Sequence, residues 1–222
     1  MWSGGVESTS IIKHYLECSS HEIFVHYIRY SSSEGRLEYE DRAVSDLLPY
    51  LQAIRPLYFS SSRLELIGGQ GLARDLQVMY PIGLVAMRHF ACSQLNRGLC
   101  MEDNWHRALG HPTQPAFGPN GAHRHIELRQ IIKPLLQYNE VLDHVAPVLP
   151  AYWWPKAKHW HNLGRMASAT WSCRRPKCGT NCYTCHSCIE RSAAQRGLSS
   201  IPEVQKILDD NPNWRIECPK ST

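Results

Sequence analysis

The sequence predicts an α/β domain built on a parallel sheet, followed by a small C-terminal region that binds a metal. Three observations support this prediction. Segments typical of buried strands alternate with segments typical of amphipathic helices, which favours a parallel sheet with crossover helices. Two adjacent glycines, Gly4 and Gly5, come directly before the first helical pattern. Five of the nine cysteines fall between Cys173 and Cys188.

The composition is that of one large globular domain, or of one domain with an appendage. The chain has 222 residues, of which 43% are hydrophobic. A net charge of +4 suits an anionic ligand such as a nucleotide, but it is too small to indicate nucleic acid on its own. The sequence shows neither a membrane-spanning run nor a signal-peptide pattern, so we expect a cytoplasmic protein. In that compartment, nine cysteines favour metal binding over disulfides.

The first nine residues contain a candidate anion site. Gly4 and Gly5 stand between hydroxyl-bearing residues, and a run with the spacing of an amphipathic helix follows them. A glycine-rich loop that opens a helix lets the backbone approach an anion, and the first free N–H groups of the helix point at it. A surface turn with a helix cap is the alternative interpretation. The hydroxyl residues are Ser3, Ser8 and Thr9, and the apolar face comprises Ile11, Ile12, Tyr15 and Leu16.

The next part of the chain alternates between strand and helix patterns. In the expected helix at residues 37–53, Pro49 should kink or end the helix. In the expected helix at residues 81–96, Pro81 takes an acceptable position in the first turn, and Leu84, Val85 and Met87 are expected to face inward. The expected elements are strands at residues 22–30, 56–60 and 98–102, and helices at residues 37–53 and 81–96.

A long loop is expected at residues 108–125, where glycine, proline and histidine are frequent, and a loop of that length in a compact domain is usually functional or mobile. Exposed loop histidines are the expectation for this region, and a second metal site is the alternative; the residues are His106, His111, His123 and His125. A helix at residues 126–138 follows. We expect an α/β domain at residues 1–147 and a C-terminal region at residues 148–222, which ends in helix or loop around Val204, Ile207 and Leu208.

Four cysteines in the C-terminal region have the spacing C-x8-C-x2-C-x2-C. Close pairs can grip an ion from a tight turn and the distant cysteine can complete a tetrahedron of thiolates, as in structural zinc sites. The ligands are Cys173, Cys182, Cys185 and Cys188. The basic neighbours Arg174, Arg175 and Lys177 would offset the thiolate charge. An iron–sulfur cluster and the absence of a metal are the alternatives, and Cys178 is a fifth candidate ligand. The isolated cysteines, expected to be buried or inert, are Cys18, Cys92, Cys100 and Cys218.

Three segments resemble one known family, in the same order along the chain. Ser3-Gly4-Gly5-Val6-Glu7-Ser8 resembles the SGGxDS pyrophosphate loop of the N-type ATP pyrophosphatases. Thr170-Trp171-Ser172-Cys173, with the three later cysteines and Arg191, resembles the zinc signature of one branch, the 7-cyano-7-deazaguanine synthase (QueC) family. The family's P-x-x-W-x-x-K-A-x-x-W stretch is matched by Pro150, Trp153, Lys156, Ala157 and Trp160.

The resemblance implies a HUP-type, Rossmann-like α/β fold and an ATP-dependent carbon–nitrogen ligase. Such an enzyme adenylates the carboxylate of a 7-deazaguanine substrate, releases AMP and pyrophosphate, and couples the acid to ammonia or an amine, as in queuosine biosynthesis. The implied cofactors are ATP, Mg²⁺ and Zn²⁺. The implied catalytic residues are Lys156 and Arg191, and Arg191 has a salt bridge within the zinc knuckle as its alternative role. The implied nucleotide-binding residues are Ser3, Gly4, Gly5, Glu7, Ser8 and Thr9.

Departures from the family pattern favour a divergent member. Glu7 stands where the loop usually has Asp, and Lys158 stands where the family often has an acid. Relatives occur in antiphage-defence operons, where a protein or a nucleic acid is the possible target, and family members are often homodimers. The rival functions are a tRNA sulfur transferase, which needs a catalytic cysteine among Cys92, Cys100 and Cys178, and an inactive zinc-bearing binding protein.

The start of the sequence presents one difficulty for this interpretation. A pyrophosphate loop normally follows a buried central strand of about five or six residues, but two residues precede Ser3 here. We therefore expect either that a strand lies upstream of Met1 or that the sheet lacks this strand, and we favour the first.

Overall fold

The computed structural model describes residues 2–31, 35–65, 75–92, 100, 154–177, 179–200 and 202–210. The expected strand at 98–102, apart from Cys100, lies outside the described residues, as do the loop at 108–125 with its histidines and the helix at 126–138. Cys178 and Cys218 also lie outside them. The elements are α1 (Val6–Cys18), β1 (Phe24–Ser31), α2 (Leu37–Ile54), β2 (Tyr58–Glu65), α3 (Asp75–His89), α6 (Lys156–Leu163), η3 (Gly164–Ala169), α7 (His186–Gln195) and α8 (Pro202–Asp210).

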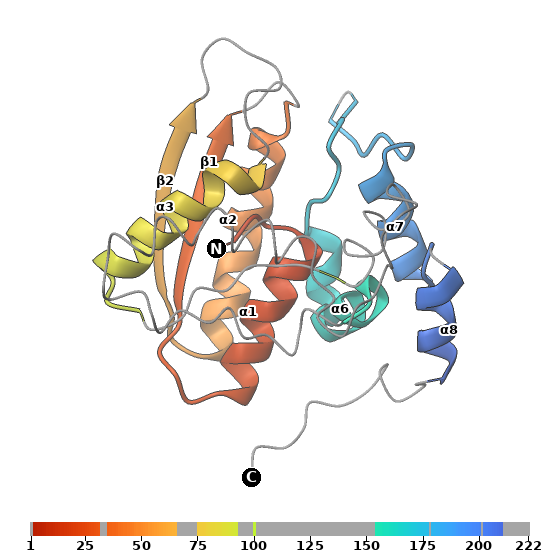
Figure 1. Ribbon diagram of the computed structural model, residues 1–222, viewed down its shortest axis with the longest axis horizontal. Helices are drawn as coiled ribbons and strands as arrows, with labels where there is room; N and C mark the ends of the chain where they lie inside the picture. Colours follow the sequence, from red (N-terminus) through yellow and green to blue (C-terminus); the bar gives the residue numbers. More distant parts are fainter. Residues whose placement is uncertain are drawn as a thin grey trace, which may run out of the picture.

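The described part of the chain is a mixed α/β structure around a small parallel sheet (Figure 1). β1 and β2 pair from Phe24 opposite Tyr58 to Ser31 opposite Glu65. Trp2 forms a single parallel bridge with Tyr27, and its backbone N–H donates to the His26 carbonyl at 2.9 Å. Since β2 occupies one edge of β1, Trp2 lies at the other. The residues before the glycine loop thus take the place of a strand beside β1, although a full Rossmann-like sheet is not present among the described residues.

Helices cover both faces of this sheet. α3 lies across one face in Figure 1, where Phe24 stacks on Phe90 with ring centroids 5.5 Å apart. α1 and α2 contribute to the core on the other face, where Val25 and Tyr27 are buried. Burial of the apolar stripes of these helices is the main stabilising term in such a layer. The buried residues of this core are Trp2, Val6, Leu16, Val25, Tyr27, Ala43, Val44, Leu47, Leu51, Leu163, Met166 and Ala167.

The C-terminal helices pack against α1 and continue the same core. α6 lies beside α1, and α7 lies beside α6 (Figure 1). Polar contacts join α6 to α1: His159 Nδ1 lies 3.0 Å from Ser10 Oγ, and Asn162 Nδ2 donates to the Ser10 carbonyl at 3.0 Å. Both His159 and Ser10 are fully buried, and Ser10 Oγ also accepts a hydrogen bond from Asn162 Nδ2 at 3.0 Å, so the polar groups between the two helices are paired.

Three local expectations were wrong. α2 does not end at Pro49 but continues to Ile54, because Leu47 and Leu51 on either side of the proline are fully buried and hold the helix on the core. α3 begins at Asp75, so Pro81 lies inside the helix, and Val85 is 69% exposed instead of facing inward. Its neighbours Leu84 and Met87 are buried as expected.

β2 is longer than the expected strand at residues 56–60. It continues through the serine cluster to Glu65, because its backbone pairs with β1 along its whole length. The serine hydroxyls also find a partner on β1. His26 Nδ1 lies 2.8 Å from Ser60 Oγ, and His26 Nε2 lies 3.0 Å from Ser62 Oγ. The serine run is therefore part of a strand, and one histidine provides hydrogen bonds for Ser60 and Ser62 on the same face.

Candidate functional site

The glycine loop, residues 3–8, packs tightly against α2. Gly4 has φ +69°, and a Cβ atom there would lie 3.1 Å from the Ala43 Cβ and 3.3 Å from the Val44 Cγ2. Gly4 is thus required both by its left-handed conformation and by the close approach of the helix. Gly5 caps the N-terminus of α1, and its cap has no side-chain hydrogen bond. The first backbone N–H groups of α1 consequently have the orientation that anion-binding helices use.

The hydroxyl groups of the loop contact one another. Ser3 Oγ and Ser8 Oγ lie 3.1 Å apart, and the Ser3 and Gly5 amides make long contacts of 3.4 Å to these hydroxyls. Contacts of this length are weak, so a stronger acceptor can replace them. Thr9 differs, because its hydroxyl is fully buried and accepts a hydrogen bond from Trp2 Nε1 at 2.9 Å. Thr9 therefore anchors the helix to the residue before the loop.

Lys156, at the first position of α6, makes an ion pair with the loop. Its Nζ lies 2.8 Å from Glu7 Oε1 and 2.6 Å from Glu190 Oε2 on α7. The side chains of Lys156 and Glu190 are 6% and 2% exposed, so these charges interact in a poorly solvated environment. The other carboxylate oxygen of Glu190, Oε1, lies 2.6 Å from His186 Nε2. One lysine therefore joins the glycine loop to the helix that carries Cys188 and is capped by Cys185.

Sequence reasoning did not identify Glu190 or His186 as part of this site. A signal was present, because Glu190 is the single acid between Thr170 and Ser200, in a segment with five Lys or Arg residues. A lone carboxylate in a basic segment has several cations available as partners. The four-residue spacing of His186 and Glu190 also places both side chains on one face of α7.

Arg191 faces backbone carbonyls. Its guanidinium donates to the carbonyl of Thr170 and to those of Ala167 and Ser168 at 3.3 Å each, so it closes the C-terminal end of η3. It also lies over the Trp160 ring, 5.0 Å from its centroid. Burial lowers the pKa of Arg191 from its ordinary value, and the nearby Cys188 and Glu7 oppose this shift. The contacts of Arg191 seen here are thus with backbone carbonyls and the Trp160 ring, and its expected phosphate contact stays a prediction.

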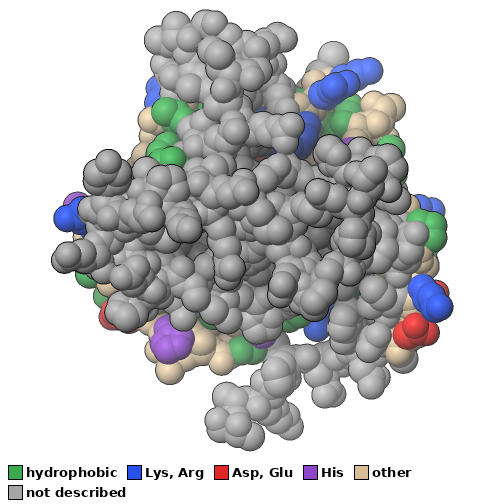
Figure 2. Space-filling model, viewed as in Figure 1, with side chains coloured by type: hydrophobic (Ala, Val, Ile, Leu, Met, Phe, Trp, Pro, Cys, Tyr) green, Lys and Arg blue, Asp and Glu red, His purple; other side chains and the backbone are tan. Residues whose placement is uncertain are grey.

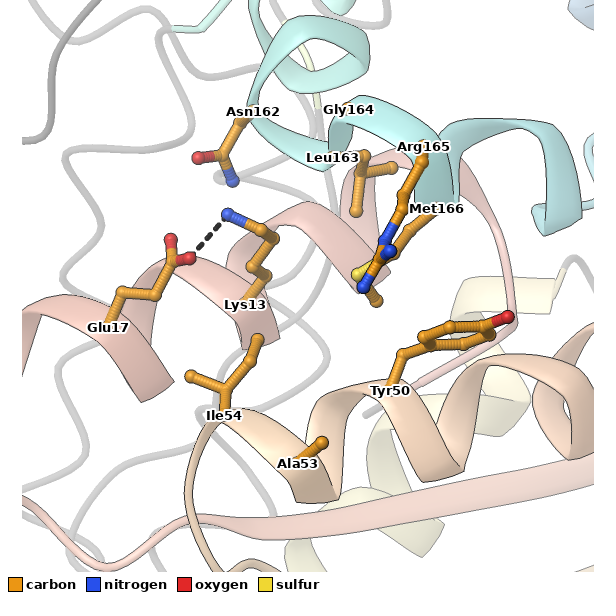
Figure 3. Close-up of a pocket in the computed structure, with 10 residues that line it drawn as sticks. All are labelled: Lys13, Glu17, Tyr50, Ala53, Ile54, Asn162, Leu163, Gly164, Arg165 and Met166. Atoms are coloured by element: carbon orange, nitrogen blue, oxygen red, sulfur yellow. Dashed lines mark hydrogen bonds and ion pairs between the residues drawn. The ribbon is translucent and has the colours of Figure 1, made fainter.

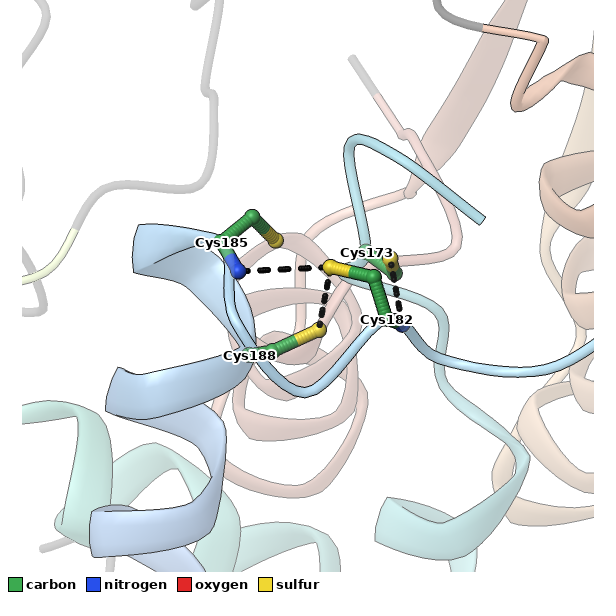
Figure 4. A group of neighbouring side chains, drawn as sticks. All are labelled: Cys173, Cys182, Cys185 and Cys188. Carbon is green, nitrogen blue, oxygen red and sulfur yellow. Dashed lines mark hydrogen bonds between the residues drawn. The ribbon is translucent and has the colours of Figure 1, made fainter. Parts of the chain in front are cut away.

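The four expected cysteine ligands converge (Figure 4). All four Sγ atoms of Cys173, Cys182, Cys185 and Cys188 lie within 4.8 Å of one another. The Cys182 and Cys188 sulfurs are 3.9 Å apart. A tetrahedral ion with metal–sulfur bonds of about 2.3 Å needs sulfurs about 3.8 Å apart, so the geometry fits such an ion. The four cysteines can therefore hold a metal ion.

Backbone amides favour the thiolate form within this cluster. The Cys185 amide donates to Cys182 Sγ at 3.2 Å, and the Cys182 amide donates to Cys173 Sγ at 3.3 Å. Backbone hydrogen bonds, that from Thr184 foremost, lower the pKa of Cys182 to about 5. Burial raises the pKa of Cys173 and of Cys188, so these two thiols need a cation to ionise at neutral pH. This donor set is the one expected for a tetrathiolate metal site.

Trp171 contacts both the cysteine cluster and the glycine loop. The Trp171 amide donates to the Gly4 carbonyl at 2.9 Å, and Trp171 Nε1 donates to the Cys173 carbonyl at 3.0 Å. Tyr39 of α2 stacks on Trp171, with ring centroids 4.5 Å apart. The loop is thus fixed to the cysteine cluster through Trp171, and to α7 through the lysine of α6. The motifs at the two ends of the chain form one continuous structure.

The other described cysteines are separate from this cluster. Cys100 is fully buried, whereas Cys18 and Cys92 are half-buried. Burial raises the pKa of the Cys92 thiol, which makes it a poorer nucleophile at neutral pH. Cys100 is thus buried as expected, and the low reactivity expected of the isolated cysteines stays a prediction.

A groove of about 400 Å³ opens at the other end of α1 (Figure 3). Lys13 and Glu17 pair across one side of it at 2.5 Å, and the Arg165 guanidinium lies over the Tyr50 ring on the other. None of the site residues expected from the sequence lines this groove. The lining residues are Lys13, Glu17, Tyr50, Ala53, Ile54, Asn162, Leu163, Gly164, Arg165 and Met166.

Comparison with known proteins finds no family model that matches the chain and no curated protein similar to it. The class defined by the fold and the site is therefore a mixed α/β protein with a glycine loop at the start of a helix and a tetracysteine cluster beside it. Within the described part of the chain, every helix is too short or too polar to cross a bilayer.

Proposed function

We propose that this protein is an ATP-dependent carbon–nitrogen ligase of the 7-cyano-7-deazaguanine synthase (QueC) type. It adenylates the carboxylate of a 7-deazaguanine-type substrate, releases AMP and pyrophosphate, and joins the acid to ammonia or an amine. The observation that carries the proposal is the direct link between the two motifs, in which the Trp171 amide donates to the Gly4 carbonyl. Segments that resemble one family at the two ends of the sequence are neighbours in space.

The glycine loop supplies the anion-binding part of the proposed site. In the proposed reaction, amides at the start of α1, with Ser3 and Ser8, donate to the oxygens of leaving pyrophosphate, which is supported by the uncapped start of α1 and the paired hydroxyls. ATP supplies the activating phosphoanhydride, and Mg²⁺ shares the charge that develops on it. Lys156 pairs with Glu7 as well as with Glu190, and it offsets part of the repulsion that the Glu7 carboxylate in the first turn of α1 would exert on an anion bound there.

Zinc is the proposed metal of the tetracysteine cluster, because four thiolates in a closed tetrahedron are the ligand set of structural zinc. The ion would hold the segments around Cys173 and Cys188 together and take no part in the chemical step. Elemental analysis is expected to find about one zinc per chain. Iron together with a visible absorbance band would indicate an iron–sulfur cluster instead.

The test of the proposal is AMP release from ATP in the presence of a deazaguanine acid and ammonium, with mass spectrometry of the product. Ser8→Ala is expected to lower turnover at least tenfold without a change in the far-UV circular dichroism spectrum, because it removes a loop donor. Ser45→Ala is the matched control, since Ser45 is exposed on α2 away from the loop. Turnover of Ser8→Ala near that of Ser45→Ala would refute the role of the loop.

The two rival functions give other results in the same experiment. Sulfur transfer to tRNA that depends on a cysteine outside the zinc set would indicate the tRNA sulfur transferase. Cys100 is a poor candidate for that reaction because it is fully buried. No nucleotide binding at millimolar ATP and Mg²⁺ would indicate the inactive binding protein and refute both enzymes.

A further inference from the structure

The positive charge of the chain is concentrated around the cysteine cluster. Between Thr170 and Ser200 there are five Lys or Arg residues and one acid, which gives this segment a net charge of +4, equal to that of the whole chain. The single acid, Glu190, is buried and paired with Lys156. At the surface this segment is therefore basic, with no exposed carboxylate among its described residues.

Three of the basic residues lie on one projecting hairpin. Lys177 and Thr180 exchange backbone hydrogen bonds of 3.0 and 3.1 Å, which closes a short turn between Cys173 and Cys182. The side chains of Arg174, Arg175 and Lys177 are exposed. In Figure 1 this hairpin extends beyond the helices at the upper right, and Figure 2 shows Lys and Arg side chains gathered at the same edge. We call Arg174, Arg175, Lys177 and Tyr183 the basic tip.

Tyr183 adds an aromatic ring to this tip. It lies between Cys182 and Cys185, has φ +57° and is 74% exposed. The tight turn between the two cysteines requires this left-handed conformation, which glycine adopts without strain and tyrosine adopts at a cost of about 1 kcal/mol. Tyr183 therefore presents a large apolar ring to solvent at the most basic part of the protein.

The negative charge of a metal-bound cysteine cluster is smaller than the positive charge of the basic tip. Four thiolates around a divalent ion leave a charge of −2, whereas the basic tip carries three positive side chains. These side chains also lie in solvent, where a buried charge attracts them only weakly. Exposed cations that can bind phosphates, and an exposed ring on the neighbouring cysteine turn that can stack on a base, are the two components of surfaces that bind single-stranded nucleic acid.

We propose that the basic tip binds single-stranded nucleic acid, with Arg174, Arg175 and Lys177 on the phosphates and the Tyr183 ring stacked on a base. The site is separate from the glycine loop, so the proposal does not depend on the ligase activity. Three phosphate contacts predict a slope of about −2 in a plot of log K against log salt concentration, and a Kd of about 1–100 µM at moderate salt. Stacking on Tyr183 is expected to contribute about 5- to 100-fold in affinity.

The test is fluorescence anisotropy of the zinc-loaded chain with a labelled 12-nucleotide single strand. Replacing Arg174, Arg175 and Lys177 together by Gln is expected to remove binding and the salt dependence. The matched control replaces three exposed cations elsewhere, Arg42, Arg88 and Lys206, by Gln and changes the net charge equally. Metal content and the melting temperature of both triple variants show whether the fold is retained.

The ring is tested separately with Tyr183→Gly, which keeps the left-handed turn and removes the aromatic face, and with Tyr183→Phe, which keeps the face. The glycine variant is expected to bind 5- to 100-fold more weakly and the phenylalanine variant to bind like the wild type. Equal loss in the two triple variants, equal binding of a duplex of the same length, or tighter binding of an acidic peptide would each overturn the proposal.

Discussion

Replacing Gly4 by Ala tests whether the glycine loop has the structure described. Two independent features oppose a side chain at this position. The backbone has φ +69°, which costs an L-residue about 1 kcal/mol relative to glycine. The added Cβ would lie 3.1 Å from the Ala43 Cβ and 3.3 Å from the Val44 Cγ2, both buried on α2. Since α2 is held in place by fully buried leucines, we expect overpacking to cost a further 1–3 kcal/mol, roughly.

Gly197→Ala separates the cost of the left-handed backbone conformation from the cost of overpacking. Gly197 follows α7 with φ +71°, and its neighbour's amide, that of Leu198, donates to the Ala193 carbonyl in a glycine-terminated helix end. A Cβ there would meet nothing within 4 Å. Gly197→Ala is therefore expected to lose about 1 kcal/mol of unfolding free energy, whereas Gly4→Ala is expected to lose about 2–4 kcal/mol.

The assay is urea unfolding of the zinc-loaded protein, followed by circular dichroism, with the slope m compared between variants. Unchanged m values would show that the difference in midpoint reports stability. Nucleotide affinity is measured on the same samples, and it is expected to fall for Gly4→Ala alone. Equal destabilisation by the two substitutions would refute the close approach of the loop to α2, because both positions share the same backbone conformation.

Three further outcomes are expected. Lys156→Met leaves the Glu7 and Glu190 carboxylates without their shared cation, so it should cost about 3 kcal/mol of unfolding free energy, and a loss no larger than that of Lys158→Met would contradict the ion pair. Removal of the metal by a chelator should lower the melting temperature and change the tryptophan fluorescence; neither change would occur if the cluster bound no metal. The Arg29 guanidinium holds the pKa of Asp41 below its usual range, so the stabilising effect of this carboxylate is present at neutral pH and is lost as the pH falls through that lowered pKa. The difference in unfolding midpoint between the wild type and Asp41→Asn should therefore shrink from pH 7 to pH 3, and a constant difference would contradict it.

Apolar periodicity predicted the elements that the core determines. The strand at 22–30 and the helix at 37–53 match β1 and α2 within a residue or two, because their apolar positions face a single core. The same method failed for the serine run of β2. There the strand depends on backbone pairing with β1 and on His26, which lies more than thirty residues earlier in the sequence. Pairing of that kind leaves no local pattern.

In the candidate site too, some residues could be predicted from the sequence and others could not. Cysteine spacing is set by the geometry of a metal tetrahedron, and therefore the four ligands could be chosen from the sequence alone. The partners of Lys156 could not be chosen, because Glu7 and Glu190 meet it through the packing of three helices. Arg191 shows the same limit, since a guanidinium that binds helix-end carbonyls looks in sequence like one that binds phosphate.

The two residues that depart from the family pattern, Glu7 and Lys158, have different contacts in the structure. Glu7 is one methylene longer than the usual aspartate, and it is this side chain that reaches Lys156 at 2.8 Å. Lys158, which stands where the family often has an acid, lies over the Trp154 ring, 4.2 Å from its centroid. Glu7 keeps the negative charge of the usual aspartate and shares the Lys156 cation with Glu190 of α7, so one positive charge faces two carboxylates beside the proposed pyrophosphate site. If the loop binds a nucleotide as proposed, loss of Lys156 would leave both carboxylates unbalanced beside it and should weaken that binding.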